Sequence, residues 1–205
     1  MATIIKTGKK ASYNDRALAW IAQANCKDAN REILNGILFV ESTNNTVHAI
    51  ATDARRLHMA RLPLSYVESL NVRINKDSDS REEWQATQIA KFTKTELILG
   101  DTSPYQYPNY KRVIPSYTHI APIPTVENRF MYGAIASTLQ KAGTLVKIVD
   151  ANFVTDLTNY DYYPTDIAYY PCTADSPNSD KNKAILISSE NDSFERIAVI
   201  MPIAD

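Results

Sequence analysis

The strongest constraint on the fold is an order of elements, one helix and then three strands, near the start of the sequence. Residues 12–24 begin with a serine, a good helix cap, and carry small and apolar side chains on one stripe, so they predict an amphipathic helix. The apolar, branched run at residues 33–40 predicts a strand, as do residues 47–52 and 57–62. This order is typical of an α+β protein whose helices cover one face of an antiparallel sheet.

The same order recurs in the C-terminal part of the chain. A helix is predicted for residues 127–142, because apolar pairs repeat along it and Gly143 can end it. Strands are predicted at residues 145–149, 184–188 and 196–201. Residues 158–183 are rich in Tyr, Asp, Asn and Pro, which favours a loop with room for a short strand at 167–170.

The middle of the sequence is less regular. Residues 70–74 and 95–99 predict strands, whereas residues 80–92 fit either a helix or a strand. Five prolines in residues 104–124 favour an extended connector.

We place the main domain boundary in this connector. The chain then divides into two units of the same order, residues 1–116 and 117–205. The alternative is one composite domain in which residues 65–124 form an insertion. In either form the expected fold class is α+β, with antiparallel sheets and helices on one face.

Composition excludes several classes of function. The 22 Lys and Arg balance 23 Asp and Glu in 205 residues, which disfavours a generally basic nucleic-acid binder. No stretch has the roughly 18 apolar residues that a membrane span needs. Cys26 and Cys172 lie far apart, so neither a disulfide framework nor a metal site is indicated. We therefore expect a cytoplasmic protein with no membrane partner.

The histidines and glycines do not form a recognisable catalytic pattern. His48, His58 and His119 have none of the spacings of metal-binding histidines, and Asp53 with His58 has no partner nucleophile. Only five glycines occur, and none of them forms a GxGxxG or GxxxxGK phosphate loop. The sequence predicts no enzymatic activity, no catalytic or metal-ligating residue and no cofactor.

Three short strings narrow the fold further. They are ATDARRL at residues 51–57, YPNYKRVIP at 107–115 and VIMPI at 199–203, and GILF at 36–39 precedes the first. In this order they resemble the bacterial replicative sliding clamp, the DNA polymerase III beta subunit. That family carries an ATDGHRL string after a GxLF-like strand, FPDYRRVxP at the end of its middle domain, and VMPM near its C-terminus.

The resemblance implies a DNA-clamp-like fold in a shortened form. The family has three similar domains per chain, whereas this sequence has room for at most two. Residues 1–116 resemble the middle domain, and residues 117–205 resemble a shortened C-terminal domain.

In the family the three strings form a cleft that binds short peptides of polymerases and other partner proteins. By position, the resemblance implies a peptide pocket made of Thr52, Arg56, Leu57, Pro108, Arg112, Val113, Val199, Met201, Pro202 and Ile203. An apolar slot with Met walls and an Arg rim suits a peptide with Leu or Phe anchors and an acidic or polar start. Two positions depart from the family pattern: Ala54-Arg55 replaces Gly-His, and Ala204-Asp205 replaces a basic penultimate residue.

The same residues also fit a simpler interpretation. Thr52 and Asp53 can form a turn between two strands, with Arg56 paired to a nearby carboxylate. Met201 and Ile203 can be ordinary core residues of the last strand.

The resemblance also implies sequence-independent binding to double-stranded DNA, encircled by a homo-oligomeric ring. The cations that flank the two predicted helices are candidates for phosphate contact: Lys6, Lys9, Lys10, Arg16, Lys27, Arg31, Arg129 and Lys141. The sequence thus predicts a processivity factor that tethers partner proteins to DNA. The alternative is a non-ring adaptor or decoy that keeps the peptide pocket without encircling DNA.

Overall fold

The computed structural model describes residues 2–8, 10–77, 84–112, 114, 168–171, 185–189 and 196–200. Its elements are β1 (Thr3–Lys6), α1 (Tyr13–Ala22), the 3-10 helix η1 (Ala29–Leu34), β2 (Gly36–Ser42), β3 (Thr46–Thr52), β4 (Arg56–Pro63), α2 (Leu64–Ser69), β5 (Gln85–Phe92), β6 (Glu96–Gln106), the 3-10 helix η3 (Tyr110–Arg112), β7 (Ala168–Pro171), β8 (Ile185–Ser189) and β9 (Arg196–Ile200).

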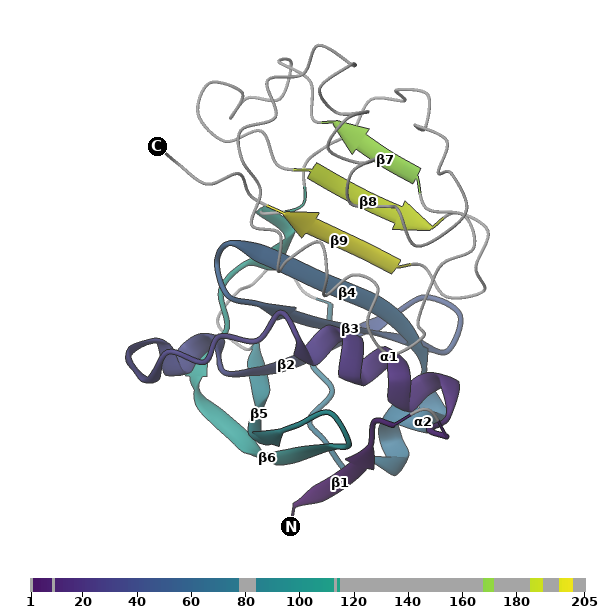
Figure 1. Ribbon diagram of the computed structural model, residues 1–205, viewed down its shortest axis with the longest axis vertical. Helices are drawn as coiled ribbons and strands as arrows, with labels where there is room; N and C mark the ends of the chain where they lie inside the picture. The colour runs from purple at the N-terminus through teal and green to yellow at the C-terminus, as the bar shows by residue number, and fades with distance from the viewer. Residues whose placement is uncertain are drawn as a thin grey trace.

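All nine of these strands belong to one sheet in the order β1-β6-β5-β2-β3-β4-β9-β8-β7, and every pairing between neighbours is antiparallel. Figure 1 shows the strands from the two ends of the chain side by side at β4 and β9. The fold is therefore α+β and mostly antiparallel sheet, which confirms the fold class expected from the sequence.

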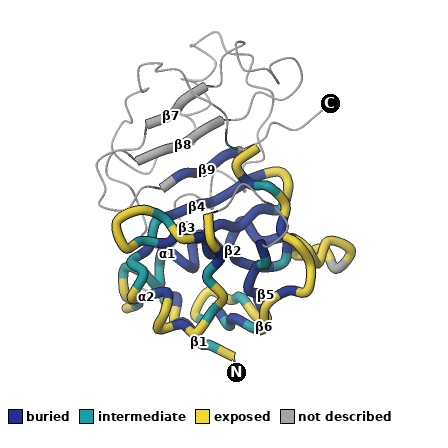
Figure 2. Tube along the Cα trace, turned by 180° about the vertical axis from the view of Figure 1, so that it is seen from behind, coloured by how far each residue is buried: buried dark blue, intermediate teal, exposed yellow. Residues whose placement is uncertain are grey.

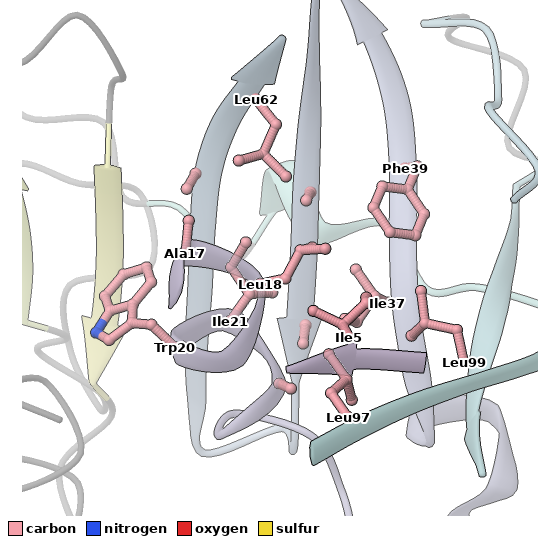
Figure 3. Packing of buried hydrophobic residues seen from close by; sticks show 14 of the residues in the cluster. Ile5, Ala17, Leu18, Trp20, Ile21, Ile37, Phe39, Leu62, Leu97 and Leu99 are labelled. Atoms are coloured by element: carbon pink, nitrogen blue, oxygen red, sulfur yellow. The ribbon is translucent and has the colours of Figure 1, made fainter. Parts of the chain in front are cut away.

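Helix α1 forms where the sequence predicts a helix. The Ser12 hydroxyl caps it by accepting a hydrogen bond from the Asp15 amide at 3.1 Å, and the Asp15 carboxylate stands in the positive first turn. The side chains from Ala17 to Ala22 are buried, and α1 contacts β4, β3 and β2. Figure 3 shows Leu18 and Ile21 pointing from α1 toward the strands.

Where burial is described, in β1 to β6 and β9, both faces of the sheet carry buried residues, and residues of a strand alternate between the faces. Ile37 and Phe39 of β2 face the helices, whereas Leu38 and Val40 face the opposite side. The helix-side cluster includes Leu18, Ile21, Ile37, Phe39, Leu62, Val67 and Leu97. The connector-side cluster consists of Leu38, Val40, Ile50, Leu57, Met59, Trp84, Ala86, Tyr107, Tyr110, Ile197 and Val199. Helices α1 and α2 thus cover one face, while segments before β5 and after β6 cover the other.

Strand β9 is buried from both sides, although it comes from the far end of the chain. Its residues from Arg196 to Ile200 pair with β4 from Ala60 to Arg56. Ala198 joins the helix-side cluster, and Val199 joins the connector-side cluster. Figure 2 shows the buried part of β9 beside the buried β4. The C-terminal segment therefore completes the core of the N-terminal part.

The boundaries of several elements differ from the sequence predictions. Strand β2 starts at Gly36, because the preceding residues form η1, capped by Asp28. A Cβ on Gly36 would lie 2.6 Å from the Thr87 carbonyl oxygen, so only glycine permits the close approach of β2 and β5. Residues 70–74 are not a strand, since Leu70 ends α2 and only Asn75 forms an isolated bridge to Val40.

Other predictions are confirmed or resolved. Residues 85–92 of the ambiguous stretch form a strand, β5. The predicted connector was expected to begin at Pro104, but strand β6 continues through this residue. Pro104 has no amide hydrogen to donate. This costs no hydrogen bond to β1, because β1 pairs with β6 only from Glu96 to Leu99. The strands predicted at 47–52, 57–62, 184–188 and 196–201 and the short strand at 167–170 are present within one or two residues. The short β1 and α2 were not predicted. The helix predicted at 127–142, the strand at 145–149 and the boundary after 116 lie outside the described residues.

Candidate functional site

The first of the three strings forms a tight turn between β3 and β4. The Thr52 hydroxyl donates to the Arg56 carbonyl oxygen at 2.6 Å and accepts from the Ala54 amide at 3.1 Å. One Asp53 carboxylate oxygen accepts from the Arg55 and Arg56 amides, both at 2.9 Å. Ala54 adopts a positive φ of 72° to close the turn. The turn therefore has a fixed shape, held by its own side chains.

Arg56 points into the protein and joins this turn to helix α1. Its Nε donates to the second Asp53 oxygen at 3.1 Å, and a terminal nitrogen donates to the Gln23 carbonyl oxygen at 2.5 Å. The side chains of Arg56 and Asp53 are 10% and 16% exposed. This is the carboxylate pairing of the simpler interpretation of the sequence, and it leaves Arg56 buried, with 8% of its surface exposed.

The second string packs against Trp84. The Tyr107 amide donates to the Trp84 carbonyl oxygen at 2.7 Å, and the Tyr110 and Trp84 ring centroids lie 5.1 Å apart. The Lys111 ammonium lies 5.7 Å from the Trp84 ring centroid and forms a 2.6 Å ion pair with Asp77. Pro108 and Arg112 are exposed. Within residues 107–112 the connector is thus anchored through its tyrosines, whereas Pro108, Lys111 and Arg112 are exposed.

The first two strings meet at Tyr107. Burial raises the pKa of the Tyr107 hydroxyl far above its usual value of 10; a contact with the Thr52 backbone lowers this pKa, and the Asp53 charge raises it. Tyr110 is less enclosed, and burial followed by the charge of Asp77 raises its pKa to about 12. Both tyrosines are therefore neutral at physiological pH, and Tyr107 lies beneath the β3–β4 turn.

The third string joins the other two in the connector-side cluster. Leu57 pairs with Val199 across β4 and β9, and both are fully buried in the cluster that contains Tyr107 and Tyr110. Of the other residues implied by the resemblance, Thr52 is 4% exposed, whereas Val113, Met201, Pro202 and Ile203 lie outside the described residues. Leu57 of the first string, Tyr107 and Tyr110 of the second and Val199 of the third thus meet in one buried cluster.

Sequence reasoning did not single out the aromatic side chains of this site. Tyr107 and Tyr110 stand inside the second string, three positions apart, and flank Pro108. Both rings enter the same buried cluster, and this pair of aromatic residues was the only signal that the sequence of the string offered. Trp84 carried no such signal, because its partner Tyr110 is distant in sequence.

His58 of β4 contacts Trp20 of helix α1. Its Nδ1 donates to the Trp20 carbonyl oxygen at 2.8 Å, and its ring stacks on the Trp20 ring with centroids 4.3 Å apart. Burial lowers the pKa of His58 to about 3, a hydrogen bond to the Trp20 backbone raises it, and Arg56 lowers it. The ring is therefore neutral at pH 7, with one nitrogen used to hold α1 against β4.

Five of the candidate DNA-facing residues are described, and they lie within α1 or close to it in the sequence. Lys6, Lys10, Lys27 and Arg31 are exposed, and Arg31 lies 4.0 Å from Asp28. Arg16 of α1 is half-buried. Lys9, Arg129 and Lys141 lie outside the described residues.

Within the described ranges, His, Cys, Asp and Glu side chains form no group of three or more that could hold a metal ion. Over the same residues, every helix is too short or too polar to cross a membrane.

Comparisons with known proteins identify the fold. Neither a protein-family model nor a curated protein matches the sequence. Among solved structures, the chain is similar to the DNA polymerase sliding clamp of Bacillus subtilis (TM-score 0.52, 13% identity, 100% of this chain and 64% of that chain). It is also similar to the DNA polymerase III beta subunit of Thermotoga maritima (TM-score 0.50, 14% identity, 100% and 66%). A third similar structure is the Helicobacter pylori beta clamp bound to a DNA ligase peptide (TM-score 0.51, 13% identity, 98% and 65%).

The likeness extends over nearly all of this chain, which spans 64 to 66% of the length of these clamps. At 13 to 14% identity, it concerns the fold. The chain therefore has, in shortened form, the fold of the bacterial DNA polymerase III beta sliding clamps.

Proposed function

We propose that the protein is a non-catalytic, sliding-clamp-like processivity factor that tethers partner proteins through a peptide pocket at the three strings. The observation that carries this proposal is the connector-side cluster, where Leu57, Tyr107 and Val199 come from strings separated by about a quarter of the chain or more. Their meeting on one face is what a shared peptide site needs.

The proposed pocket has a rigid floor and a polar rim. Leu57 and Val199 support the floor from beneath, since both are fully buried. Pro108 and Arg112 are exposed at the connector and form one rim, and the β3–β4 turn forms another. Residues 201–203 follow directly after β9 and complete the apolar wall in this proposal. Val113 is the remaining wall residue.

A titration on a matched pair of variants tests the pocket. The probe is a fluorescein-labelled DNA ligase peptide of the kind bound to the Helicobacter pylori clamp. Met201→Ala removes one proposed wall, so we expect peptide affinity to fall by about 1 to 3 kcal/mol, while the thermal midpoint stays close to that of the unmodified chain. Ile4→Ala, at a side chain that is 61% exposed on β1, is the control that leaves affinity unchanged.

Two results would count against the proposal. A stable Met201→Ala protein with unchanged affinity would show that the residue is not part of a peptide pocket. A loss of about 2 to 5 kcal/mol in stability would instead assign Met201 to the core.

We further propose that the assembled protein encircles duplex DNA in the cytoplasm as a homo-oligomeric ring, with polymerases or other peptide-bearing proteins as partners. The exposed cations around α1, Lys6, Lys10, Lys27 and Arg31, support phosphate contact without base readout. A monomer in solution that binds the peptide and is not retained on circular DNA would favour the adaptor.

A further inference from the structure

The polar side chains of the β3–β4 turn are almost all used within the protein. The Thr52 hydroxyl both donates and accepts inside the turn. The two Asp53 oxygens accept from two backbone amides and from Arg56, and the Arg56 guanidinium is shared between Asp53 and Gln23. Arg55 is the remaining polar side chain, and it is exposed.

Arg55 is not neutralised by the described residues. No ion pair joins it to a carboxylate in the described part of the chain. Asp53 lies nearby in sequence, but its oxygens are already engaged by Arg56 and the turn amides. The backbone of Arg55 is nevertheless held in place, because its amide donates to Asp53 at 2.9 Å and Ala54 before it has a fixed turn conformation.

The connector adds a second exposed cation to the proposed rim. Lys111 is paired with Asp77 at 2.6 Å, so its charge is balanced. Arg112 beside it is exposed, and like Arg55 it forms no ion pair with the described carboxylates. Two exposed guanidinium groups without a described ion pair thus belong to the two segments that form the rim of the proposed pocket, Arg55 to the β3–β4 turn and Arg112 to the connector.

We infer that Arg55 is a specificity-determining residue that selects peptides carrying a carboxylate side chain next to their apolar anchors. This inference rests on the proposed peptide pocket and adds the chemistry of its partner. A guanidinium on a fixed backbone can donate two parallel hydrogen bonds to a carboxylate, and its charge does not depend on pH. The resemblance implies that Arg56 contacts the peptide, but Arg56 is turned inward. We therefore assign this polar contact with the peptide to Arg55.

The test compares two labelled peptides that differ only in charge. Both are ten residues long with the same Leu and Phe anchors, and two Glu in one are replaced by Gln in the other. With the full chain at low salt, the Glu peptide is expected to bind about three- to tenfold more tightly than the Gln peptide, and the preference is expected to shrink as salt is added. Arg55→Gln is expected to remove the preference, and Arg55→Glu to reverse it.

The matched control is Lys94→Gln, which makes the same charge change at an exposed residue of the β5–β6 turn. It is expected to keep the preference for the Glu peptide. Equal binding of both peptides to the unmodified chain, or a preference that survives in Arg55→Gln, would overturn the role of Arg55 and leave the pocket standing. No binding of either peptide would overturn the pocket itself, and this inference with it.

Discussion

Ala54 has an unusual backbone conformation in the β3–β4 turn. Its φ of 72° is a conformation that L residues adopt at a cost and glycine adopts freely. We predict that Ala54→Gly raises the free energy of unfolding by up to about 1 kcal/mol, measured by urea denaturation. Ala51→Gly in the regular strand β3 is the control and should lower it by a similar amount. Equal losses in both variants would show that the turn is not strained at Ala54.

The low pKa of His58 predicts that the stability of the protein depends on pH. The pKa of His58 in the folded protein, about 3, is below the usual value of 6.5, so the unfolded chain binds one more proton between these pH values. The free energy of unfolding should therefore fall as the pH is lowered from about 6.5, by at most about 1.4 kcal/mol per pH unit from this residue. Denaturation at pH 7, 6 and 5 measures the slope.

The matched variant is His58→Gln, which cannot titrate in this range. It should be less stable at pH 7, because the stacking on Trp20 is lost. It should also show a shallower slope than the unmodified chain. The same slope in both proteins would mean that His58 does not remain neutral in the folded state.

Among the elements, β9 connects the C-terminal part of the chain to the core through its pairing with β4. Val199 is fully buried between β4 and the connector tyrosines, so we predict that Val199→Ala costs about 1 to 3 kcal/mol of stability. Hydrogen exchange should show faster exchange of amides in β4 as well as β9, because the strands pair over five residues. If only β9 responds, the two ends of the chain do not share one core.

The predictability of the elements followed the length of their patterns. Helix α1 and strands β3 and β4 have several turns or alternations each, and the sequence predicted them closely. Strand β1 has four residues and α2 has six with no side-chain cap, so neither carries enough pattern to be recognised. The start of β2 was misplaced because Ile33 and Leu34 are apolar, yet the Asp28 cap directs them into η1.

The candidate site was predictable in its segments and not in its side chains. The three strings indicated which parts of the chain to bring together. The inward turn of Arg56 depends on the carbonyl of Gln23, 33 positions away, and the packing of Trp84 on Tyr110 depends on a contact that no local pattern encodes. Tertiary contacts therefore decided which arginine of the turn is buried and which is exposed.

For the molecule as a whole, the proposed ring of protomers can be tested on circular and linear DNA. If protomers close into a ring, the protein should be retained on circular duplex DNA and lost from linear DNA of the same length. Binding should weaken steeply with salt, because the contacts are to phosphates. Light scattering measures the oligomeric mass in parallel. Equal retention on both DNA forms would indicate surface attraction in place of encirclement.

Chemical-shift mapping measures whether the three distant strings form one peptide site. The isotope-labelled chain is titrated with the unlabelled ligase peptide, and shifts of the backbone amides are followed. We predict that the largest shifts fall together in residues 53–57, 107–112 and 199–203, with small shifts in β1 and the β5–β6 turn. Shifts confined to one string, or centred on β1 and α2, would show that the three strings do not form one peptide site.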